Sequence, residues 1–205
     1  MPQRRRTPRQ ARAKEKVERI LAAARAILTE DGPAVLNTNL LAQRAGVGVG
    51  SIYEYFPNKQ AIVDQLIEQL SVEETDAMLE RFVEVEKLPM GEAVRVLVAA
   101  IFDIYRANQG VYRRLWAMAV EPRYVGVRPG EQMVMDQMRR RLEPLVDELG
   151  IVDLELTVFT AFHMVESLCE RFCAQGVDGF GVDASVDEIT RAITRYLGLT
   201  KSEQS

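Results

Sequence analysis

The residues most suited to chemistry lie in one short stretch, AGVGVGSIYEYFPNK, which runs from Ala45 to Lys59. Three glycines fall within five positions there, and two tyrosines, a phenylalanine, a proline and an Asn-Lys pair follow with hardly a charge between them. Glycine allows a tight turn or a close approach of the backbone to another molecule. The stretch therefore indicates a turn and a contact surface within a chain that is otherwise rich in helix formers.

A catalytic centre would have to use His163, because the sequence contains one histidine. Cys169 and Cys173 lie nearly two and nearly three helical turns beyond it, too far for a local Cys-His pair. The HExxH, GxSxG and P-loop patterns are absent from the sequence. We therefore expect no enzyme activity, no metal site and no cofactor. The two cysteines are interpreted as small buried hydrophobes, with a thiol sensor as the alternative.

Charge is divided unevenly along the chain. Residues 1–60 hold eleven Lys and Arg against five Asp and Glu, a net of +6, whereas residues 61–205 hold fifteen against twenty-five, a net of -10. This asymmetry indicates that the N-terminal end meets a polyanion. The first sixteen residues, MPQRRRTPRQARAKEK, are predicted to form a flexible basic arm, which serves either that contact or solubility.

Length and composition limit the class of protein. The 205 residues, 47% hydrophobic and 27% charged, suit one sizeable folded domain or a small domain fused to a larger one. No uncharged apolar run approaches the ~20 residues of a membrane span, and the basic N-terminus lacks the apolar stretch of a signal peptide. We expect a cytoplasmic protein without a membrane partner.

The elements that position the glycine stretch are predicted to be short helices. Apolar residues recur at helical spacing from Val17 to Leu28, and the pattern stops at DGP (residues 31–33). Asn37 is a predicted N-cap for the helix TNLLAQRA, which Gly46 ends, and VGSIYEYF forms a third helix. Two short helices joined by a tight glycine turn form a helix-turn-helix.

The rest of the chain is also predicted to be helical. Asn58 can cap a long helix that begins at Lys59, Pro144 should kink or divide a later one, and Ser185 with Glu188 forms a predicted capping box for the last. The other helices are predicted at about residues 90–107, 111–120, 131–149, 153–174 and 185–198. No alternating strand pattern occurs, so the fold class is all-α. The predicted parts are an arm (1–16), a helix-turn-helix domain (17–58), a second helical domain (59–199) and a flexible tail (200–205).

Residues 17–70 resemble the DNA-binding domain of the tetracycline-repressor-like (TetR) transcriptional regulators. The segment LLAQRAGVGVGSIYEYFPNKQAIVDQL matches a family pattern of an apolar-Ala pair, Ala-Gly-Val, Gly followed by Thr or Ser, an apolar-Tyr pair, His or Tyr followed by Phe, and then Lys. The resemblance covers about a quarter of the chain, and the later helices match the family only in number and order. Many relatives have Thr-Thr where this chain has Leu36 and Asn37, and Ser where it has Gly48, which bears on base preference rather than on the fold.

The resemblance implies that the third helix reads double-stranded DNA. Gly50 and Ser51 would lie nearest the base edges, Tyr53 would reach phosphates and sugars, and Lys59 would bind a phosphate. Glu54 is either repelled by phosphate or accepts a hydrogen bond from a cytosine amino group. Tyr55 is divided between a phosphate contact and the core. The predicted DNA-binding residues are Thr38, Asn39, Gly48, Val49, Gly50, Ser51, Tyr53, Glu54, Tyr55 and Lys59.

The resemblance also implies a ligand-binding body whose last two helices pair across a two-fold axis. The predicted dimer-interface residues are Leu154, Val158, Ala161, Val165, Leu168, Phe172, Ile189, Ile193 and Tyr196. The predicted ligand-binding residues, an apolar and pliable set from the middle helices, are Phe102, Tyr105, Trp116, Met118, Met133, Met138, Phe159 and His163.

The implied function is a transcriptional repressor. It would bind a palindromic operator as a homodimer and be released by a small, largely apolar effector. Two alternatives remain open from the sequence: an architectural DNA-binding protein without a ligand, and a thiol-sensing regulator that uses Cys169 and Cys173.

Overall fold

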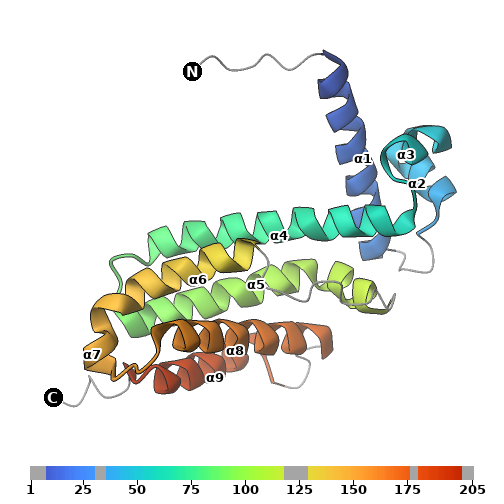
Figure 1. Ribbon diagram of the computed structural model, residues 1–205. Helices are drawn as coiled ribbons and strands as arrows, with labels where there is room; N and C mark the ends of the chain where they lie inside the picture. The colour runs from blue at the N-terminus through green and yellow to red at the C-terminus, as the bar shows by residue number, and fades with distance from the viewer. Residues whose placement is uncertain (1–7, 31–35, 118–128, 176–179, 200–205) are drawn as a thin grey trace. The chain divides into compact units, whose positions relative to one another are not determined.

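The computed structural model describes residues 8–30, 36–117, 129–175 and 180–199. All regular elements in these ranges are helices (Figure 1), which confirms the predicted all-α fold class for the described part of the chain. No helix in this part is long and apolar enough to cross a membrane. The chain divides into two compact units: unit 1 contains residues 1–70 and 110–121, and unit 2 contains residues 71–109 and 122–205.

Unit 1 is built around the predicted helix-turn-helix. It contains α1 (Pro8–Glu30), α2 (Thr38–Ala45), α3 (Val49–Tyr55) and the first turns of α4 (Lys59–Glu84). Apolar side chains from all four helices share one core, because each short helix has one apolar face and can bury it only against the others. The largest fully buried side chains of this core are Ile20, Ile27, Leu28, Leu41, Ile52, Val63, Leu66 and Leu70.

Local hydrogen bonds set the ends of the short helices. The Asn37 Oδ1 accepts from the backbone N of Leu40 at 2.9 Å, and the Asn58 Oδ1 accepts from the backbone N of Ala61 at 2.9 Å. Both asparagines are therefore the N-caps that the sequence predicts. Gly46 ends α2 with a φ of +62°, the left-handed conformation that favours glycine. The predicted helix end at residues 31–33 lies outside the described residues.

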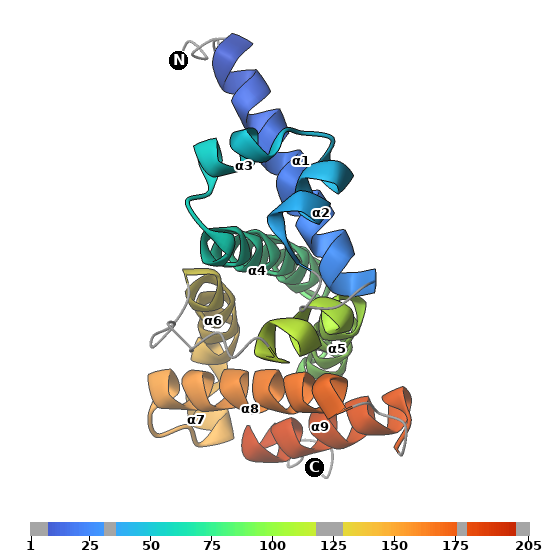
Figure 2. The same cartoon turned by 90° about the vertical axis from the view of Figure 1, so that its right-hand side faces the viewer.

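Unit 2 contains the rest of α4, most of α5 (Met90–Ala117), α6 (Pro129–Leu142), α7 (Val146–Leu149), α8 (Leu154–Gln175) and α9 (Val182–Tyr196). α8 and α9 lie side by side (Figure 2). Gly130 lets the start of α6 approach α4 closely, since a Cβ there would lie 2.0 Å from the Thr75 Oγ1. The core is again apolar and is centred on side chains such as Phe102, Val98, Val158, Ala161, Ile189 and Ile193.

Two helix boundaries differ from the sequence prediction. α1 begins at Pro8, so residues 8–16 are helical rather than a flexible arm; proline fits the first turn of a helix, and the Arg, Lys, Gln, Glu and Ala that follow are good helix formers without being core residues. α5 is one continuous helix instead of two. Asn108 does not interrupt it, because its side-chain amide donates to Glu74 Oε1 at 3.1 Å.

The C-terminal helices follow the sequence prediction at Pro144 but not at Ser185. α6 ends at Leu142, and a 3₁₀ turn (η2, Glu143–Leu145) separates it from α7. The predicted capping box is wrong, because α9 already begins at Val182. The buried Ser185 hydroxyl donates to the Gly181 carbonyl at 2.9 Å, as a serine inside a helix does. Residues 1–7 and 200–205 lie outside the described residues.

Candidate functional site

The outer face of α3 offers side chains to a partner outside unit 1. Ile52 and the following Phe56 are buried in the core, and they hold the helix by its inner face. On the opposite face Tyr53 is 56% exposed, Glu54 is exposed and Ser51 is half-buried. α3 is therefore positioned by packing on one side and is accessible on the other.

The start of α2 brings further polar groups to the same place. The hydroxyl of Thr38 lies 3.5 Å from the hydroxyl of Tyr53, within hydrogen-bonding distance. Asn39 follows Thr38 and is exposed. Predicted contact residues from two helices thus form one continuous polar surface.

Gly48 and Gly50 are not required by the packing of unit 1. The φ of Gly48 is -72°, which any residue adopts, and a Cβ added at either glycine would meet no atom within 4 Å. Glycine inside a helix destabilises it by about 1 kcal/mol relative to alanine. Gly48 is the N-cap of α3 and Gly50 lies in its first turn, and the absence of a side chain at both positions leaves room for another molecule to approach the α3 backbone closely.

Tyr55 and Lys59 have different environments. Tyr55 is half-buried and packs against the core of unit 1, so its ring has a structural role. Lys59 is exposed at the first position of α4, directly after the cap Asn58. Of the two, Lys59 has the side chain that reaches solvent beside α3.

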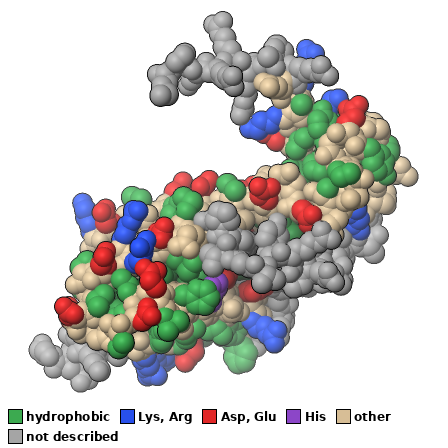
Figure 3. All heavy atoms as spheres, viewed as in Figure 1, with side chains coloured by type: hydrophobic (Ala, Val, Ile, Leu, Met, Phe, Trp, Pro, Cys, Tyr) green, Lys and Arg blue, Asp and Glu red, His purple; other side chains and the backbone are tan. Residues whose placement is uncertain are grey.

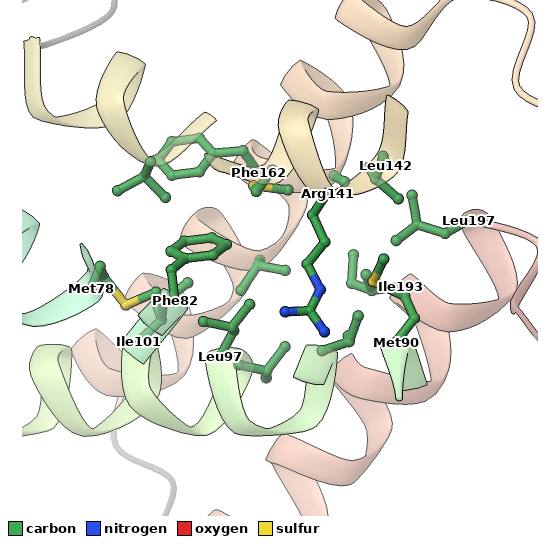
Figure 4. A pocket seen from close by; sticks show the side chains of 16 residues that line it. Met78, Phe82, Met90, Leu97, Ile101, Arg141, Leu142, Phe162, Ile193 and Leu197 are labelled. Atoms are coloured by element: carbon green, nitrogen blue, oxygen red, sulfur yellow. The ribbon is translucent and has the colours of Figure 1, made fainter. Parts of the chain in front are cut away.

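An apolar pocket lies inside unit 2 (Figure 4). Side chains from α4, α5, α6, α8 and α9 line it, among them Met78, Phe82, Met90, Leu97, Met138 and Phe162. Its volume is about 70 Å³, whereas sites for drug-sized ligands enclose ~300–1,000 Å³. A ligand of that size therefore enters only if side chains move, and three of these six are methionines, which adapt readily.

A second pocket adjoins the first within unit 2. The two share Met78, Ile101, Val134 and Phe162, but the second is also lined by three carboxylates, those of Glu74, Glu131 and Glu166.

One of these carboxylates takes part in a small polar cluster. Tyr105 donates its hydroxyl to Glu166 Oε1 at 3.3 Å, and the His163 Nδ1 lies 3.2 Å from Glu166 Oε2. The imidazole also packs edge-on against Phe159, with 4.3 Å between ring centroids. Glu166 therefore has partners in Tyr105 and His163, and the His163 ring has partners in Glu166 and Phe159 within the chain.

The structure separates the predicted ligand-binding residues. Met138 lines the apolar pocket, Tyr105 lines the second pocket, and Phe159 lines a hollow between α6 and α8. Phe102 is fully buried in the core of unit 2, and Met133 is 50% exposed. The side chain of Trp116 and the whole of Met118 lie outside the described residues.

Most of the predicted dimer-interface residues pack inside the chain itself. Five of them are buried in the core of unit 2: Val158, Ala161, Val165, Ile189 and Ile193. The prediction is wrong for these five residues, because a side chain already buried in its own core cannot contact a second copy. Leu154 and Phe172 are half-buried, whereas Leu168 and Tyr196 are exposed.

Sequence reasoning missed Leu156 of α8, and it assigned Phe159 of the same helix to the ligand-binding set. Leu156 is 61% exposed and Phe159 is 47% exposed, on a face that the core of unit 2 does not cover. Hydrophobic side chains lie among acidic and basic ones on the surface of unit 2 (Figure 3). The available signal was that α8 is apolar on more than one face, which exceeds what a helix packed on one side requires.

Two family models match the chain. Residues 20–66 match a model described as bacterial regulatory proteins, tetR family, and residues 89–197 match one described as a tetracyclin repressor-like C-terminal domain. The second match alone spans more than half of the chain. The chain belongs to the TetR family.

Relatives and solved structures extend this likeness. The nucleoid occlusion factor SlmA of Actinobacillus pleuropneumoniae is 30% identical over 111 residues, 52% of this chain and 52% of that protein, so the chain spans about half the length of the curated relatives it matches. A protein from Mesorhizobium loti described as a TetR-family transcriptional regulator has a TM-score of 0.71 at 14% identity, over 92% of this chain and 98% of its own. The fatty acid degradation regulator FadR from Bacillus halodurans has a TM-score of 0.59 at 20% identity, over 95% and 97%. At these identities the structures show the fold.

A contact that the TetR motif did not reveal holds the turn between α2 and α3. The Nη2 of Arg19, on α1, donates to the carbonyls of Ala45 at 2.5 Å and Gly46 at 2.7 Å. α1 thereby fixes the turn that orients α3. The sequence gives no signal for this contact beyond an arginine on a helix, because the partners are backbone atoms distant in the chain.

The thiol alternative depends on a residue of the TetR C-terminal region. Cys169 is fully buried in the core of unit 2, where a thiol has little access to oxidants. The side chain of Cys173 lies outside the described residues. Redox sensing by this pair stays a prediction.

Proposed function

We propose that this TetR-family protein is a transcriptional repressor that binds double-stranded DNA as a homodimer and leaves it when a small effector occupies unit 2. The observation that carries the DNA-binding part is the outer face of α3. There Tyr53 and Ser51 lie beside two glycines that the fold does not require, and Thr38 adjoins them from α2.

The chemistry of this face suits the two kinds of contact that a sequence-specific DNA-binding protein makes. The hydroxyl of Tyr53 and the amine of Lys59 can donate to phosphate oxygens, which position the protein without reading sequence. Ser51 can donate to or accept from a base edge, and Gly50 beside it lets the helix backbone approach the groove. Glu54, on the same face, would disfavour a phosphate and favour a cytosine amino group.

A homodimer is proposed because one α3 reads few base pairs. Two copies on a two-fold axis would read both halves of a palindrome, separated by about one or more helical turns of ~34 Å. Leu156 and Phe159, three residues apart and therefore neighbours on the exposed surface of α8, support an interface on this face of unit 2. Leu168 lies nine residues beyond Phe159 and so on the opposite flank of the helix.

The effector part of the proposal rests on α4. This helix runs without a break from Lys59, beside α3, to Met78 and Phe82, which line the apolar pocket. An effector that prefers one arrangement of α4 changes the population of the DNA-binding arrangement by its differential affinity. The apolar pocket favours this reading over an architectural protein without a ligand.

Salt dependence tests the DNA-binding face with a matched pair of variants. Lys59→Ala and Lys87→Ala each remove one exposed lysine, the first beside α3 and the second in unit 2 after α4. We expect Lys59→Ala to weaken binding to every DNA sequence and to reduce the slope of log K against log salt by about 0.9 for each phosphate that the lysine neutralises. Lys87→Ala should retain the wild-type slope. Equal slopes for both variants would contradict the assigned face.

A further inference from the structure

One charged side chain extends into the apolar pocket of unit 2. Among the described residues that line this pocket, Arg141 of α6 carries the single charge, and the rest are apolar. Figure 4 shows its guanidinium group directed into the space among the side chains of Leu97, Met90 and Ile193. The side chain is half-buried. A cation in such surroundings requires hydrogen-bond partners.

The bonds that Arg141 makes are to neutral backbone carbonyls. Its Nη1 donates to the carbonyl of Val85 at 2.6 Å, and its Nη2 donates to the carbonyl of Leu88 at 2.7 Å. These contacts tie α6 to the end of α4, but both acceptors are neutral. No carboxylate of the described residues forms an ion pair with Arg141. A guanidinium has five N–H donors, so donors remain for an anion.

The adjoining second pocket makes the distribution of charge around the site uneven. The carboxylates of Glu74, Glu131 and Glu166 line it, beyond the apolar side chains that the two pockets share. The apolar pocket therefore has a cationic group in its lining, and the adjoining pocket has acidic groups. A ligand with one negative charge would be attracted toward Arg141 and repelled from the second pocket.

We propose that the ligand of the apolar pocket is an anionic amphipath, with its carboxylate on Arg141 and its hydrocarbon chain among the apolar side chains of the pocket. The inference uses the proposed function only in taking this pocket as the effector site. Bidentate pairing of a guanidinium with a carboxylate is both strong and geometrically specific. The methionines Met78, Met90 and Met138 would yield space to the chain.

A series of probes that differ only in the head group tests the proposal on the wild-type protein. Dodecanoate, dodecanol and dodecyltrimethylammonium, each kept below its micelle concentration, are titrated by calorimetry without DNA. We expect dodecanoate to bind about 10- to 100-fold more tightly than dodecanol, the range of a charge-assisted hydrogen bond, and the cation to bind most weakly. Equal binding of acid and alcohol, tighter binding of the cation, or binding of none of the three would overturn the proposal.

Variants of two neighbouring arginines then test whether Arg141 causes the preference for dodecanoate. Arg141→Gln should reduce the dodecanoate preference over dodecanol to less than threefold, and Arg141→Lys should retain part of it. Arg140→Gln, which removes an exposed charge from the preceding position of α6, should leave the preference at its wild-type value. A preference that survives Arg141→Gln would overturn the assignment to this residue, and the wild-type series decides the matter should that variant not fold.

The probe series and the DNA experiment fail separately. Suppose that Lys59→Ala reduces the salt slope of DNA binding but the wild-type protein shows no preference for dodecanoate. That result would retain the DNA-binding proposal and overturn the anion site. A clear dodecanoate preference in a protein that does not bind DNA would support the anion site and contradict the repressor.

Discussion

Gly46 and Gly50 lie close together in the sequence but are glycines for different physical reasons. Gly46 has a φ of +62°, and a Cβ there would lie 2.6 Å from the Arg19 Nη2, so the fold itself requires a residue without a side chain. Gly50 has open space around it and no positive φ. A stability measurement and a binding measurement should therefore separate the two.

Replacing Gly50 by alanine should raise stability and impair DNA binding together. The new methyl group meets no atom of unit 1, and alanine is the better helix former, so we expect the free energy of unfolding to stay equal or rise by up to about 1 kcal/mol. The same methyl group would stand between α3 and the DNA, and affinity should fall at least tenfold. Urea denaturation and a DNA titration measure the two effects.

Gly91 provides a matched control for Gly50. Each is the second residue of its helix, α5 and α3 respectively, and neither would bring a Cβ within 4 Å of another atom. Gly91→Ala should change stability by a similar amount and leave DNA affinity unchanged. If Gly50→Ala bound DNA as tightly as wild type, the close-approach explanation for this glycine would be wrong.

Residues whose roles depend on nearby backbone were predictable from the sequence. Asn37 and Asn58 cap helices through atoms three residues away, so the sequence contains the whole interaction. The ligand-binding set was different. Phe102 and Met133 both suit a pliable apolar site by type, yet one is fully buried and the other half exposed, because tertiary packing decides which helix face meets a cavity.

At the scale of elements, the turn between α2 and α3 depends on α1. Gly46→Ala should destabilise the protein through two effects: alanine in a left-handed conformation costs about 1–2 kcal/mol, and the Arg19 side chain must move and release the Ala45 and Gly46 carbonyls. We expect a loss of about 2–4 kcal/mol in the free energy of unfolding, measured by urea denaturation.

Gly150 isolates the first of these effects. It ends α7 with a φ of +66°, but a Cβ there would meet no atom within 4 Å. Gly150→Ala should therefore show only the backbone cost of about 1–2 kcal/mol. An equal loss for both variants would mean that the Arg19 contacts add nothing to the stability of the turn.

Helix boundaries show why the elements were only partly predictable. Periodicity finds a helix where one face is apolar, so it located α2, α3 and the start of α4, which pack on a common core. It missed the start of α1, because the residues from Pro8 to Lys16 are helical without an apolar face. It also divided α5 at residues 108–110, where Asn108 donates to Glu74 on another helix, a tertiary contact that periodicity does not show.

At the scale of the whole molecule, the exposed apolar face of α8 should decide the oligomeric state. Phe159→Glu places a charge on this face outside the buried core and loses the edge-on contact with His163, so we expect a folded monomer by light scattering at micromolar concentration, with reduced affinity for a palindromic duplex. A charge at the buried Val165 should instead unfold unit 2, since an unpaired charge would enter the core.

Val83 is the control for the dimer variant. It is an exposed apolar residue of α4, 73% accessible, and lies outside the proposed interface. Val83→Glu should remain dimeric and bind DNA as wild type does. A dimeric Phe159→Glu protein, or a wild-type monomer at the same concentration, would contradict an interface on α8.

The coupling between effector and DNA is the last expectation at this scale, and it needs no variant. A palindromic duplex is first obtained by selecting tightly bound sequences from a random pool, and dodecanoate affinity is then measured with and without it. If α4 links the pocket to the α3 surface, linkage requires each ligand to weaken the other by the same factor. A factor of about 100, equivalent to ~2.7 kcal/mol, would suffice for a strong shift in occupancy of the duplex.

We expect dodecanoate to bind the DNA complex more weakly by the factor with which it lowers DNA affinity. Equal dodecanoate affinities in the two states would show that occupancy of the pocket does not reach α3, and the proposed repressor would then need another site of control.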